Sequence, residues 1–513
     1  MQRRTMQRSL LRRGIVHTPA HPYATAIATY DGVVTWIGDE SGADSWAVAA
    51  DEVVDLEGAL LTPAFVDSHV HLAQTGLAAG GLSLHGLRNR DEVLQALSEH
   101  AARRGDTLLL GFGWDESRWP DPVPPTRLEV DRASGGRAVY LARTDVHSAI
   151  VSSALVERFP AIAAAPGWSA NGRVERDAHH EARMATDALV TPGIREDAMR
   201  HALRTAAAQG IGLVHEMGAP HLSPVEDFVR LDAIASSQSV PDVARYWGEL
   251  GAYEVAHQIG ALGLAGDLCV DGAIGSRTCA LERPYADAPQ ARGHVYVQAE
   301  QLCEHLVGCT RAGLQSGFHV IGDRAMRVVT EALRAAAVEV GEPALRAARH
   351  RLEHVEMADA ATLAVLGDLG VVASVQPAFD ATWGGPDGVY ALRLGTERAL
   401  AMNPFASMRS AGVVLALGSD SPVTPMDAWG GVRAACTHRS AWQRLTVQQA
   451  FDAHTRGGWW AIGRDDGGVL RAGSADVRRV GRLRRARRPV AGADSRHAVT
   501  GLPADRRPGS GGP

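Results

Sequence analysis

Ala64-Phe-Val-Asp-Ser-His-Val-His71 is the stretch that decides the fold, because an apolar run ends there in two histidines separated by one residue. Side chains of a β-strand alternate between its two faces, so His69 and His71 point the same way. Neutral imidazoles are common ligands of zinc and similar ions. A single His-x-His pair also occurs among ordinary surface residues, so its meaning depends on the rest of the chain.

Seven further apolar runs, most of them ending in polar residues, follow this one. They span residues 212–216, 242–247, 267–271, 317–323, 351–355, 371–376 and 413–420. Stretches rich in Ala, Leu and Arg, typical of helices, separate most of them. Eight strands alternating with helices predict an α/β protein, a (β/α)8 TIM barrel, rather than an open sheet.

Three of these runs carry further candidate metal ligands: His319 in the fifth strand, His354 in the sixth and Asp420 at the end of the eighth. Each one alone has a plainer interpretation, a hydrogen-bonded core histidine or, for Asp420, a helix N-cap. The ends of barrel strands converge on one mouth, where active sites lie. Together with His69 and His71, these residues therefore predict one metal site.

The barrel is expected to span residues 64–460. The strands expected in residues 1–63 predict a small β-sandwich-like domain before it, and the gap at about 73–205 is too long for one helix, so it predicts an insertion above the barrel. Residues 461–513 are predicted to be a remnant of the small β domain, whose C-terminal half is incomplete, followed by a basic tail that does not pack. From Asp476 onward, ten arginines face three aspartates, which indicates either a basic tail for an acidic partner or a shifted reading frame.

Composition excludes several classes of function. The net charge of −6 gives no general attraction to nucleic acid or to a membrane surface, and no apolar run is long enough to span a bilayer. Five cysteines without a Cys-x-x-Cys pair suit reduced thiols and a cytoplasmic location. The chain contains no lysine, so no lysine can act as a catalytic base, a Schiff base or a metal-bridging carbamate.

Several motifs together resemble the amidohydrolase superfamily, and more narrowly its amidohydrolase family 3 branch, the YtcJ-like proteins. The resemblance covers about residues 14–475. It rests on Thr62-Pro-Ala-Phe-Val-Asp-Ser-His-Val-His-Leu72, Arg143-Thr-Asp-Val-His147, Asp271-Gly-Ala-Ile-Gly-Ser-Arg-Thr278, His319-Val-Ile-Gly-Asp-Arg324, Arg351-Leu-Glu-His354 and Leu417-Gly-Ser-Asp-Ser-Pro-Val423.

This resemblance implies a metal-dependent hydrolase of C–N bonds in amides or cyclic amides of small molecules, and a homodimer, since similar proteins are often dimers. Many members of the superfamily bridge two metal ions with a carbamylated lysine from the fourth strand, which this chain lacks. One arrangement left open is a single Zn²⁺ held by His69, His71, His319 and Asp420, with His354 near the water or the substrate. The other is a pair of ions bridged by Cys269, Asp271, Glu216 or hydroxide alone.

In either arrangement, Asp420 is expected to act as general base and then general acid, and His354 or His319 to stabilise the oxyanion. The candidate substrate contacts are Arg277, His147, Asp145, Trp114 and Asp115. Structural roles compete with these assignments, since an arginine can anchor a loop carboxylate and Trp114 can belong to the core of the insertion. Two other functions compete as well: a lactonase or ester hydrolase that uses the same site, and a non-catalytic metal-binding relic.

Overall fold

The computed structural model describes residues 7–19, 21–103, 105, 108–237 and 240–471, and the chain divides into two compact units. Unit 1 comprises residues 1–62 and 471–513, and unit 2 comprises residues 63–470. The basic segment that begins at Asp476 and the strands expected between 472 and 513 lie outside the described residues. Within the described part of the chain, none of the helices combines the length and the apolarity needed to cross a membrane.

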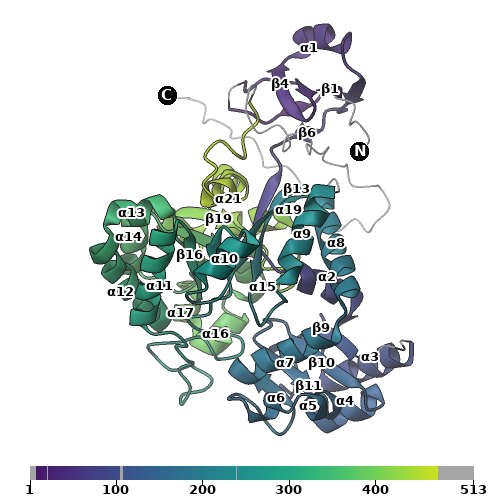
Figure 1. The fold of residues 1–513 in the computed structure, drawn as a ribbon, viewed down its shortest axis with the longest axis vertical. Helices are drawn as coiled ribbons and strands as arrows, with labels where there is room; N and C mark the ends of the chain where they lie inside the picture. Colours follow the sequence, from purple (N-terminus) through teal and green to yellow (C-terminus); the bar gives the residue numbers. More distant parts are fainter. Residues whose placement is uncertain (1–6, 20, 104, 106–107, 238–239, 472–513) are drawn as a thin grey trace, which may run out of the picture. The chain divides into compact units, whose positions relative to one another are not determined.

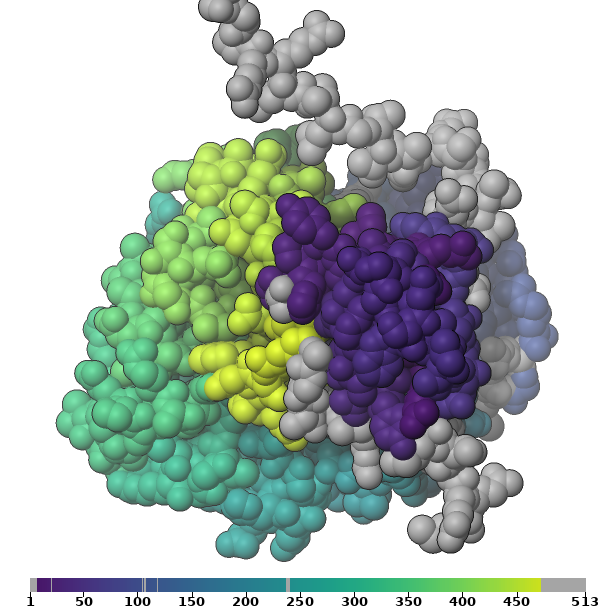
Figure 2. Space-filling model, turned by 90° about the horizontal axis from the view of Figure 1, so that it is seen from above, coloured from purple at the N-terminus to yellow at the C-terminus, as the bar shows by residue number. Residues whose placement is uncertain are grey.

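Unit 1 contains two small sheets and one helix, α1 (Glu40–Ala47). The first sheet has the order β4-β3-β1-β5, and β2 pairs with β6 in the second. The hairpin between β3 and β4 turns at Asp31 and Gly32, which both have positive φ, as a tight two-residue hairpin turn requires. Figure 2 shows these residues (purple) gathered into one body. The strands are β1 (Arg8–Arg12), β2 (Ile15–Val16), β3 (Ala26–Tyr30), β4 (Val33–Gly38), β5 (Glu52–Asp55) and β6 (Leu60–Leu61).

Unit 2 is built on eight parallel strands that curl into a nearly closed barrel, which confirms the predicted TIM barrel (Figure 1). The strands are β7 (Phe65–Val70), β13 (Ile211–Gly218), β14 (Asp242–Trp247), β15 (Gly263–Leu264), β16 (Gln315–Val320), β17 (Arg351–His354), β18 (Val372–Val375) and β19 (Val414–Leu417). One expected strand was misplaced: the fourth strand is β15, so residues 267–271 follow it instead of forming it.

The barrel closes between its first and last strands through a short seam. Val70 and Ser421 form an isolated parallel bridge, the Asp420 amide donates to the His69 carbonyl at 2.8 Å, and the His71 amide donates to the Ser421 carbonyl at 2.9 Å. Gly418 permits this approach, because a Cβ there would lie 2.7 Å from the His69 nitrogen. The seam therefore brings the polar ends of β7 and β19 together.

Helices cover the outside of the barrel and bury their apolar faces against it. In α12 (Asp323–Val340), Ala325, Met326, Val329, Leu333 and Ala336 recur at helical spacing and are all buried. The other helices that follow the barrel strands are α8 (Pro192–Ala208), α9 (Glu226–Ser237), α10 (Tyr253–Ile259), α11 (Ala299–Ala312), α13 (Glu342–Ala348), α14 (Ala360–Asp368), α15 (Pro377–Trp383), α16 (Val389–Leu394), α17 (Thr396–Leu400), α18 (Phe405–Ser410), α19 (Ala428–Cys436), α20 (Val447–Ala453) and α21 (Arg456–Ala461).

Between β7 and β13 the chain forms an additional layer around a five-stranded sheet of order β12-β11-β10-β9-β8. Helices α3 to α7 pack around this sheet, in the lower part of Figure 1. We call residues 81–189 the insertion. Its elements are β8 (Leu82–Ser83), α3 (Arg90–Arg103), β9 (Leu108–Trp114), a 3₁₀ turn (Glu116–Arg118), α4 (Arg127–Ser134), β10 (Ala138–Arg143), β11 (Ser148–Val151), α5 (Ser153–Arg158), α6 (Ala161–Ala164), β12 (Arg173–Glu175) and α7 (Arg176–Leu189), and α2 (Leu72–Gly80) leads into it.

Candidate metal centre

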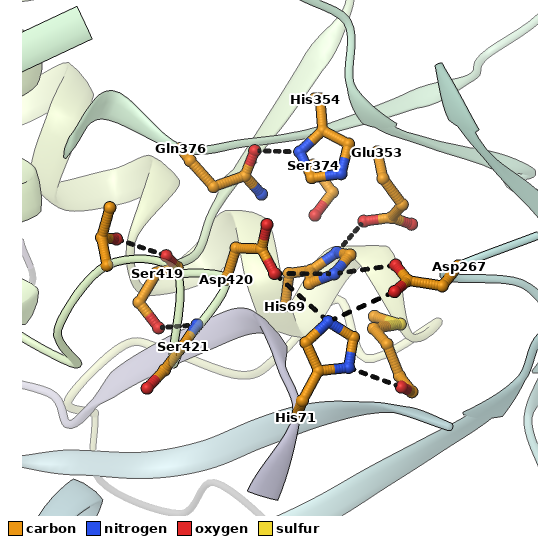
Figure 3. Close-up of polar contacts among 12 residues, drawn as sticks. His69, His71, Asp267, Glu353, His354, Ser374, Gln376, Ser419, Asp420 and Ser421 are labelled. Atoms are coloured by element: carbon orange, nitrogen blue, oxygen red, sulfur yellow. Dashed lines mark hydrogen bonds and ion pairs between the residues drawn. The ribbon is translucent and has the colours of Figure 1, made fainter. Parts of the chain in front are cut away.

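Two histidines and two aspartates converge where the barrel strands end (Figure 3). His69 and His71 lie at the end of β7, Asp420 follows β19, and Asp267 follows β15. The His69 Nε2 atom lies 3.5 Å from Asp420 Oδ1 and 3.6 Å from Asp267 Oδ1. The His71 Nε2 atom lies 3.2 Å from Asp420 Oδ1 and 3.6 Å from Asp267 Oδ2.

These separations fit a shared cation. Two ligand atoms bound to one tetrahedral ion at about 2.1 Å each lie about 3.4 Å apart, which is longer than a direct hydrogen bond. His69, His71 and Asp267 have ligand atoms within 4.8 Å of one another, and so do His69, His354 and Asp420. His69 belongs to both groups, so the two groups form one continuous cluster of nitrogen and oxygen donors.

The far side of three imidazoles is held by a hydrogen bond that orients the ring. The Nδ1 atom of His69 lies 2.8 Å from Glu353 Oε2, that of His71 lies 2.8 Å from the Met217 carbonyl, and that of His354 lies 2.8 Å from Gln376 Oε1. Each of these oxygens accepts a hydrogen bond, so Nδ1 carries the proton and Nε2 presents its lone pair. This arrangement is typical of metal-binding histidines.

Glu353 is itself fixed by a buried arginine. Arg351 donates from Nε to Glu353 Oε1 at 2.6 Å and from Nη2 to the Ser68 carbonyl at 2.7 Å. Although burial favours the neutral acid, Arg351 and His69 outweigh it and hold the pKa of Glu353 well below its usual range. A charged carboxylate therefore stands behind the His69 ring.

His319 adds a fourth imidazole beside the cluster. Its ring centroid lies 4.4 Å from that of His354 and 5.0 Å from that of His147. Neither ring nitrogen of His319 has a hydrogen-bond partner among the described residues, although the side chain is buried, and the same holds for His69 Nε2. Buried polar atoms without partners are rare in native proteins, so these nitrogens indicate a ligand.

The backbone is strained at the same place. His354, Val355 and Asp420 have φ values of 74°, 50° and 54°, in the left-handed region that non-glycine residues seldom occupy. Such strain costs on the order of 1–3 kcal/mol at each residue and is concentrated at functional sites. Two of the five predicted metal ligands thus have an unfavourable backbone conformation that aims their side chains.

The electrostatics of the cluster favour a cation. Burial lowers the pKa of His69, but the carboxylates of Asp420, Asp267 and Glu353 more than offset it, so the pKa lies well above its usual value. Burial would raise the pKa of Asp267, yet His71 and His69 hold it well below its usual range. Positive charge is therefore stabilised at the centre of this cluster.

Four of the five predicted ligands, His69, His71, His354 and Asp420, lie in the cluster, and His319 lies beside it. Asp267 was missed, because a fourth strand at residues 267–271 placed this residue at the beginning of a strand. The available signal was Gly266-Asp267, a glycine and an acidic residue directly after the apolar run that forms β15.

None of the bridging ligands expected from the sequence belongs to the two ligand groups found among the described residues. Asp271 accepts hydrogen bonds from the amides of Ala280, Ile321 and Gly322 at 2.8–2.9 Å. Glu216 accepts from the Leu72 amide at 2.8 Å. Cys269 lies in a neighbouring pocket instead.

A pocket beside the cluster, the main pocket, is shared by the barrel and the insertion. Asp145 and His147, two of the predicted substrate contacts, line it together with the predicted ligands His319, His354 and Asp420. Its other lining residues are Arg143, Ala273, Ile274, Gly275, Ile321, Glu356, Phe379, Trp383, Val389, Tyr390 and Val423. The lining thus consists partly of aromatic and apolar side chains, which we call the aromatic wall, and partly of polar side chains, which we call the polar wall.

Arg143 organises the polar wall through three carboxylates. Its Nε donates to Glu116 at 2.8 Å, Nη1 to Asp145 at 2.7 Å and Nη2 to Asp115 at 2.8 Å. Asp145 also accepts from the Ser276 hydroxyl at 2.7 Å, which ties the insertion to the barrel. Arg143 is fully buried, so this network is shielded from solvent.

The other three predicted substrate contacts are not among the lining residues of the main pocket. Trp114 is buried in the core of the insertion and donates from Nε1 to the Leu141 carbonyl at 2.9 Å. Asp115 pairs with Arg143 and caps the 3₁₀ turn through Ser117. Arg277 pairs with Asp287, with Nη2 to Oδ2 at 2.7 Å. Arg277 and Trp114 thus hold the places that their structural interpretations describe.

Comparisons with known proteins agree with this geometry. A family model described as "Amidohydrolase family" matches residues 52–477. The putative amidohydrolase YtcJ of Bacillus subtilis is 26% identical over 474 residues, which cover 84% of this chain and 85% of that protein. The N-substituted formamide deformylase of Arthrobacter pascens is 22% identical over 447 residues, which cover 78% of this chain and 77% of that protein.

A solved structure has the same fold. The crystal structure of an uncharacterized metal-dependent hydrolase from Pyrococcus furiosus superposes with a TM-score of 0.71 at 24% identity, covering 91% of this chain and 97% of that chain.

Proposed function

We propose that this chain, which belongs to the amidohydrolase family and is a metal-dependent hydrolase, cleaves a C–N bond in an amide or cyclic amide of a small molecule. The observation that best supports the proposal is the convergence of His69, His71, Asp267 and Asp420 at ion-sharing distances. The name of the Bacillus subtilis relative supports the amide class, and the deformylase from Arthrobacter pascens acts on an N-substituted formamide by its name.

The metal that fits these donors is a single Zn²⁺, because zinc accepts imidazole nitrogens and carboxylate oxygens in tetrahedral sites. His69, His71, Asp267 and Asp420 would hold it, with His319 and His354 facing it. When bound, such an ion lowers the pKa of a water molecule and polarises a carbonyl group. Asp267 supplies a carboxylate in a chain that has no lysine and so cannot form the carbamate of many superfamily members.

Asp420 serves as the proton carrier in this proposal. It lies at the border of the cluster and of the main pocket, so it can accept a proton from the attacking water and pass it to the leaving nitrogen. His354, oriented by Gln376, faces the same space and stabilises the negative oxygen that forms during attack. Asp145 and His147 then contact the substrate from the side of the insertion.

The first test measures metal directly. Full-length protein purified without added metal should contain about one zinc ion per chain by elemental analysis, and chelation should lower its melting temperature. Asp267→Asn should lose most of the metal and most of this temperature shift. Asp466→Asn, which alters an exposed carboxylate, should retain both. A second ion per chain would contradict the single-ion site, and full metal retention in Asp267→Asn would remove this residue from it.

The second test concerns the bond that is cleaved. The metal-loaded protein should hydrolyse members of a panel of amides, cyclic amides and N-substituted formamides faster than the corresponding esters and lactones. Faster turnover of lactones would replace the amide proposal by an ester-hydrolase function. Full metal loading without turnover of any member would favour a non-catalytic protein.

A further inference from the structure

A second pocket, which we call the side pocket, opens from the metal cluster into the insertion. Four of its lining residues, His71, His319, Asp267 and Asp420, belong to the metal cluster or lie beside it, and we call them its floor. Its other lining residues, which we call its wall, are Val146, His147, His179, His180, Arg183, His221 and Cys269. A substrate group bound here would therefore lie close to the reacting bond without entering the main pocket.

The histidines of the side pocket are packed against one another. The rings of His180, on α7, and His221, in the loop after β13, are stacked with centroids 4.2 Å apart. The His179 Nε2 atom lies 2.8 Å from the Tyr140 hydroxyl, so this ring nitrogen already has a hydrogen-bond partner within the protein. No group of three metal-ligating residues from this wall was found among the described residues. The wall is therefore suited to hydrogen bonding and not to holding a second ion.

Arg183 is the cation of this wall; it is half-buried, and it differs from the fully buried arginines in having no carboxylate partner within the described part of the chain. No carboxylate of the described residues lies within ion-pair distance of its guanidinium, whereas Arg143 has three and Arg195 pairs with Asp227 at 3.1 Å. Asp187, one turn further along α7, interacts electrostatically with Arg183, but burial raises its pKa to about 7.

The charge of Arg183 acts on the whole wall. Burial and then Arg183 lower the pKa of His180 to about 4, and the same two causes hold the pKa of His179 well below its usual value. Burial, with His180 and Arg183, also lowers the pKa of His221. The imidazoles are therefore neutral, and Arg183 carries the positive charge of the wall alone.

Counting charges shows what the side pocket lacks. One divalent ion would balance Asp267 and Asp420 on the floor, and the neutral histidines add nothing, so Arg183 leaves a single uncompensated positive charge. A guanidinium and a carboxylate form two parallel hydrogen bonds, and a monoanion matches a single charge better than a phosphate dianion does. The neutral imidazoles of His180 and His221 can donate further hydrogen bonds to the same group.

We propose that Arg183, with His180 and His221, binds a carboxylate of the substrate, so that this enzyme acts on amides that also carry a negative charge. The inference rests on the proposed function, because it names the class of substrate for that same site. It assigns the side pocket to the anionic end of the substrate and the aromatic wall of the main pocket to the apolar end.

Binding of small probes tests this assignment without requiring turnover. Succinamate and glutaramate each carry one amide and one carboxylate, and succinamide and glutaramide are their neutral counterparts. Titration calorimetry on the metal-loaded full chain should show at least about tenfold tighter binding of the anionic probes. The preference should weaken as ionic strength rises.

Variants show whether Arg183 is responsible. Arg183→Gln should abolish the preference, Arg183→Lys should retain part of it, and Arg204→Gln, an exposed arginine on α8, should leave it unchanged. If Arg183→Gln does not fold, His180→Asn and Arg183→Lys provide the comparison, and each should reduce the preference.

Equal affinity for charged and neutral probes, or no binding of either, would overturn the proposal, as would an undiminished preference in Arg183→Gln. Ammonia release from the same probes is measured separately. An anion preference without any hydrolysis would count against the proposed function and leave the carboxylate site standing.

Discussion

Two buried polar clusters lie side by side at the mouth of the barrel, and they differ in how completely their hydrogen-bonding groups are satisfied. Around Arg143, all three guanidinium nitrogens donate to carboxylates at 2.7–2.8 Å. In the metal cluster, His69 Nε2 and both nitrogens of His319 have no partner among the described residues. The Asp267 carboxylate lies 3.6 Å from the Nε2 atoms of His69 and His71, and the Asp420 carboxylate lies 3.5 Å from His69 Nε2. These distances are too long for ordinary hydrogen bonds.

We interpret this difference as that between a cluster that supports the fold and one suited to binding a ligand. Removing one partner from a fully paired buried network leaves uncompensated charges, so substitutions there should mainly lower the free energy of unfolding. A cluster of ligand atoms that point toward one another without forming hydrogen bonds is completed by a bound ion or molecule. Substitutions there should change ligand binding and catalytic rate more than stability. The same criterion separates Arg143 from Arg183.

The largest effect is expected for Asp420→Asn. Because Asp420 is the proposed proton carrier, its loss should lower the rate of amide hydrolysis by about 10²–10⁴-fold, while circular dichroism and melting temperature remain near those of the wild type. Steady-state kinetics on the best substrate of the panel provide the measurement, and Asp466→Asn is the matched control. A rate within tenfold of the wild type would remove Asp420 from the reaction.

For the saturated cluster, Arg143→Gln should act on stability. It removes the buried cation shared by Asp115, Glu116 and Asp145, of which Glu116 keeps Arg393 at 3.6 Å, so the free energy of unfolding should fall by about 3–5 kcal/mol. Urea unfolding measures this, with Arg204→Gln as the exposed control, and elemental analysis should show unchanged metal content in the folded protein. Loss of metal at unchanged stability would mean that Arg143 supports metal binding and not the fold.

Glu353 connects the two kinds of behaviour, because it is fully paired and yet orients His69, a proposed metal ligand. Glu353→Gln should weaken metal affinity by about 10–100-fold, since the partner of His69 Nδ1 becomes neutral. Competition with a chelator of known affinity gives the value. Glu254→Gln, at an exposed position on α10, should not change it. Equal affinity in both variants would mean that Glu353 only pairs with Arg351.

The smallest effect concerns Asp187, a buried carboxylate whose pKa burial raises to about 7. In the unfolded chain an aspartate loses its proton near pH ~4, so between about pH 4 and pH 7 the folded state keeps a proton that the unfolded state has lost. The contribution of Asp187 to stability therefore falls as the pH rises through this window.

Asp187→Asn removes this dependence. The variant should be more stable than the wild type at pH 8, by on the order of 1 kcal/mol, and about equal at pH 4. Melting temperatures at the two pH values decide the matter. A stability difference that is the same at both would show that Asp187 does not titrate in this range.

The strand ends could be predicted from the sequence because two simple periodicities govern them. His69 and His71 follow from the alternation of a strand, and His354 and Asp420 follow from apolar runs that end in polar residues. Asp267 could not be found in this way, because β15 has only two residues and the chain leaves the sheet before the acidic residue. A strand that short carries almost no periodic signal.

The substrate contacts were harder to predict for a different reason. Whether Arg277, Trp114 or Asp115 faces a pocket depends on partners that lie 10 to 28 residues away, such as Asp287, the Leu141 carbonyl and Arg143. No local pattern specifies such pairings. Arg183 and His221, which lie on α7 of the insertion and in a barrel loop, share a pocket only once the insertion has folded against the strand ends.

The seam between β7 and β19 also sets an order of events during synthesis. His69 and His71 leave the ribosome some 350 residues before Asp420, with Asp267 between them, so a nascent chain holds an incomplete set of donors for most of its translation. Contacts between residues so distant in sequence form late and slowly. Barrel closure, and with it the assembly of the proposed ion site, therefore waits for the last strand, and a chain that ends before residue 420 lacks one of the proposed ligands.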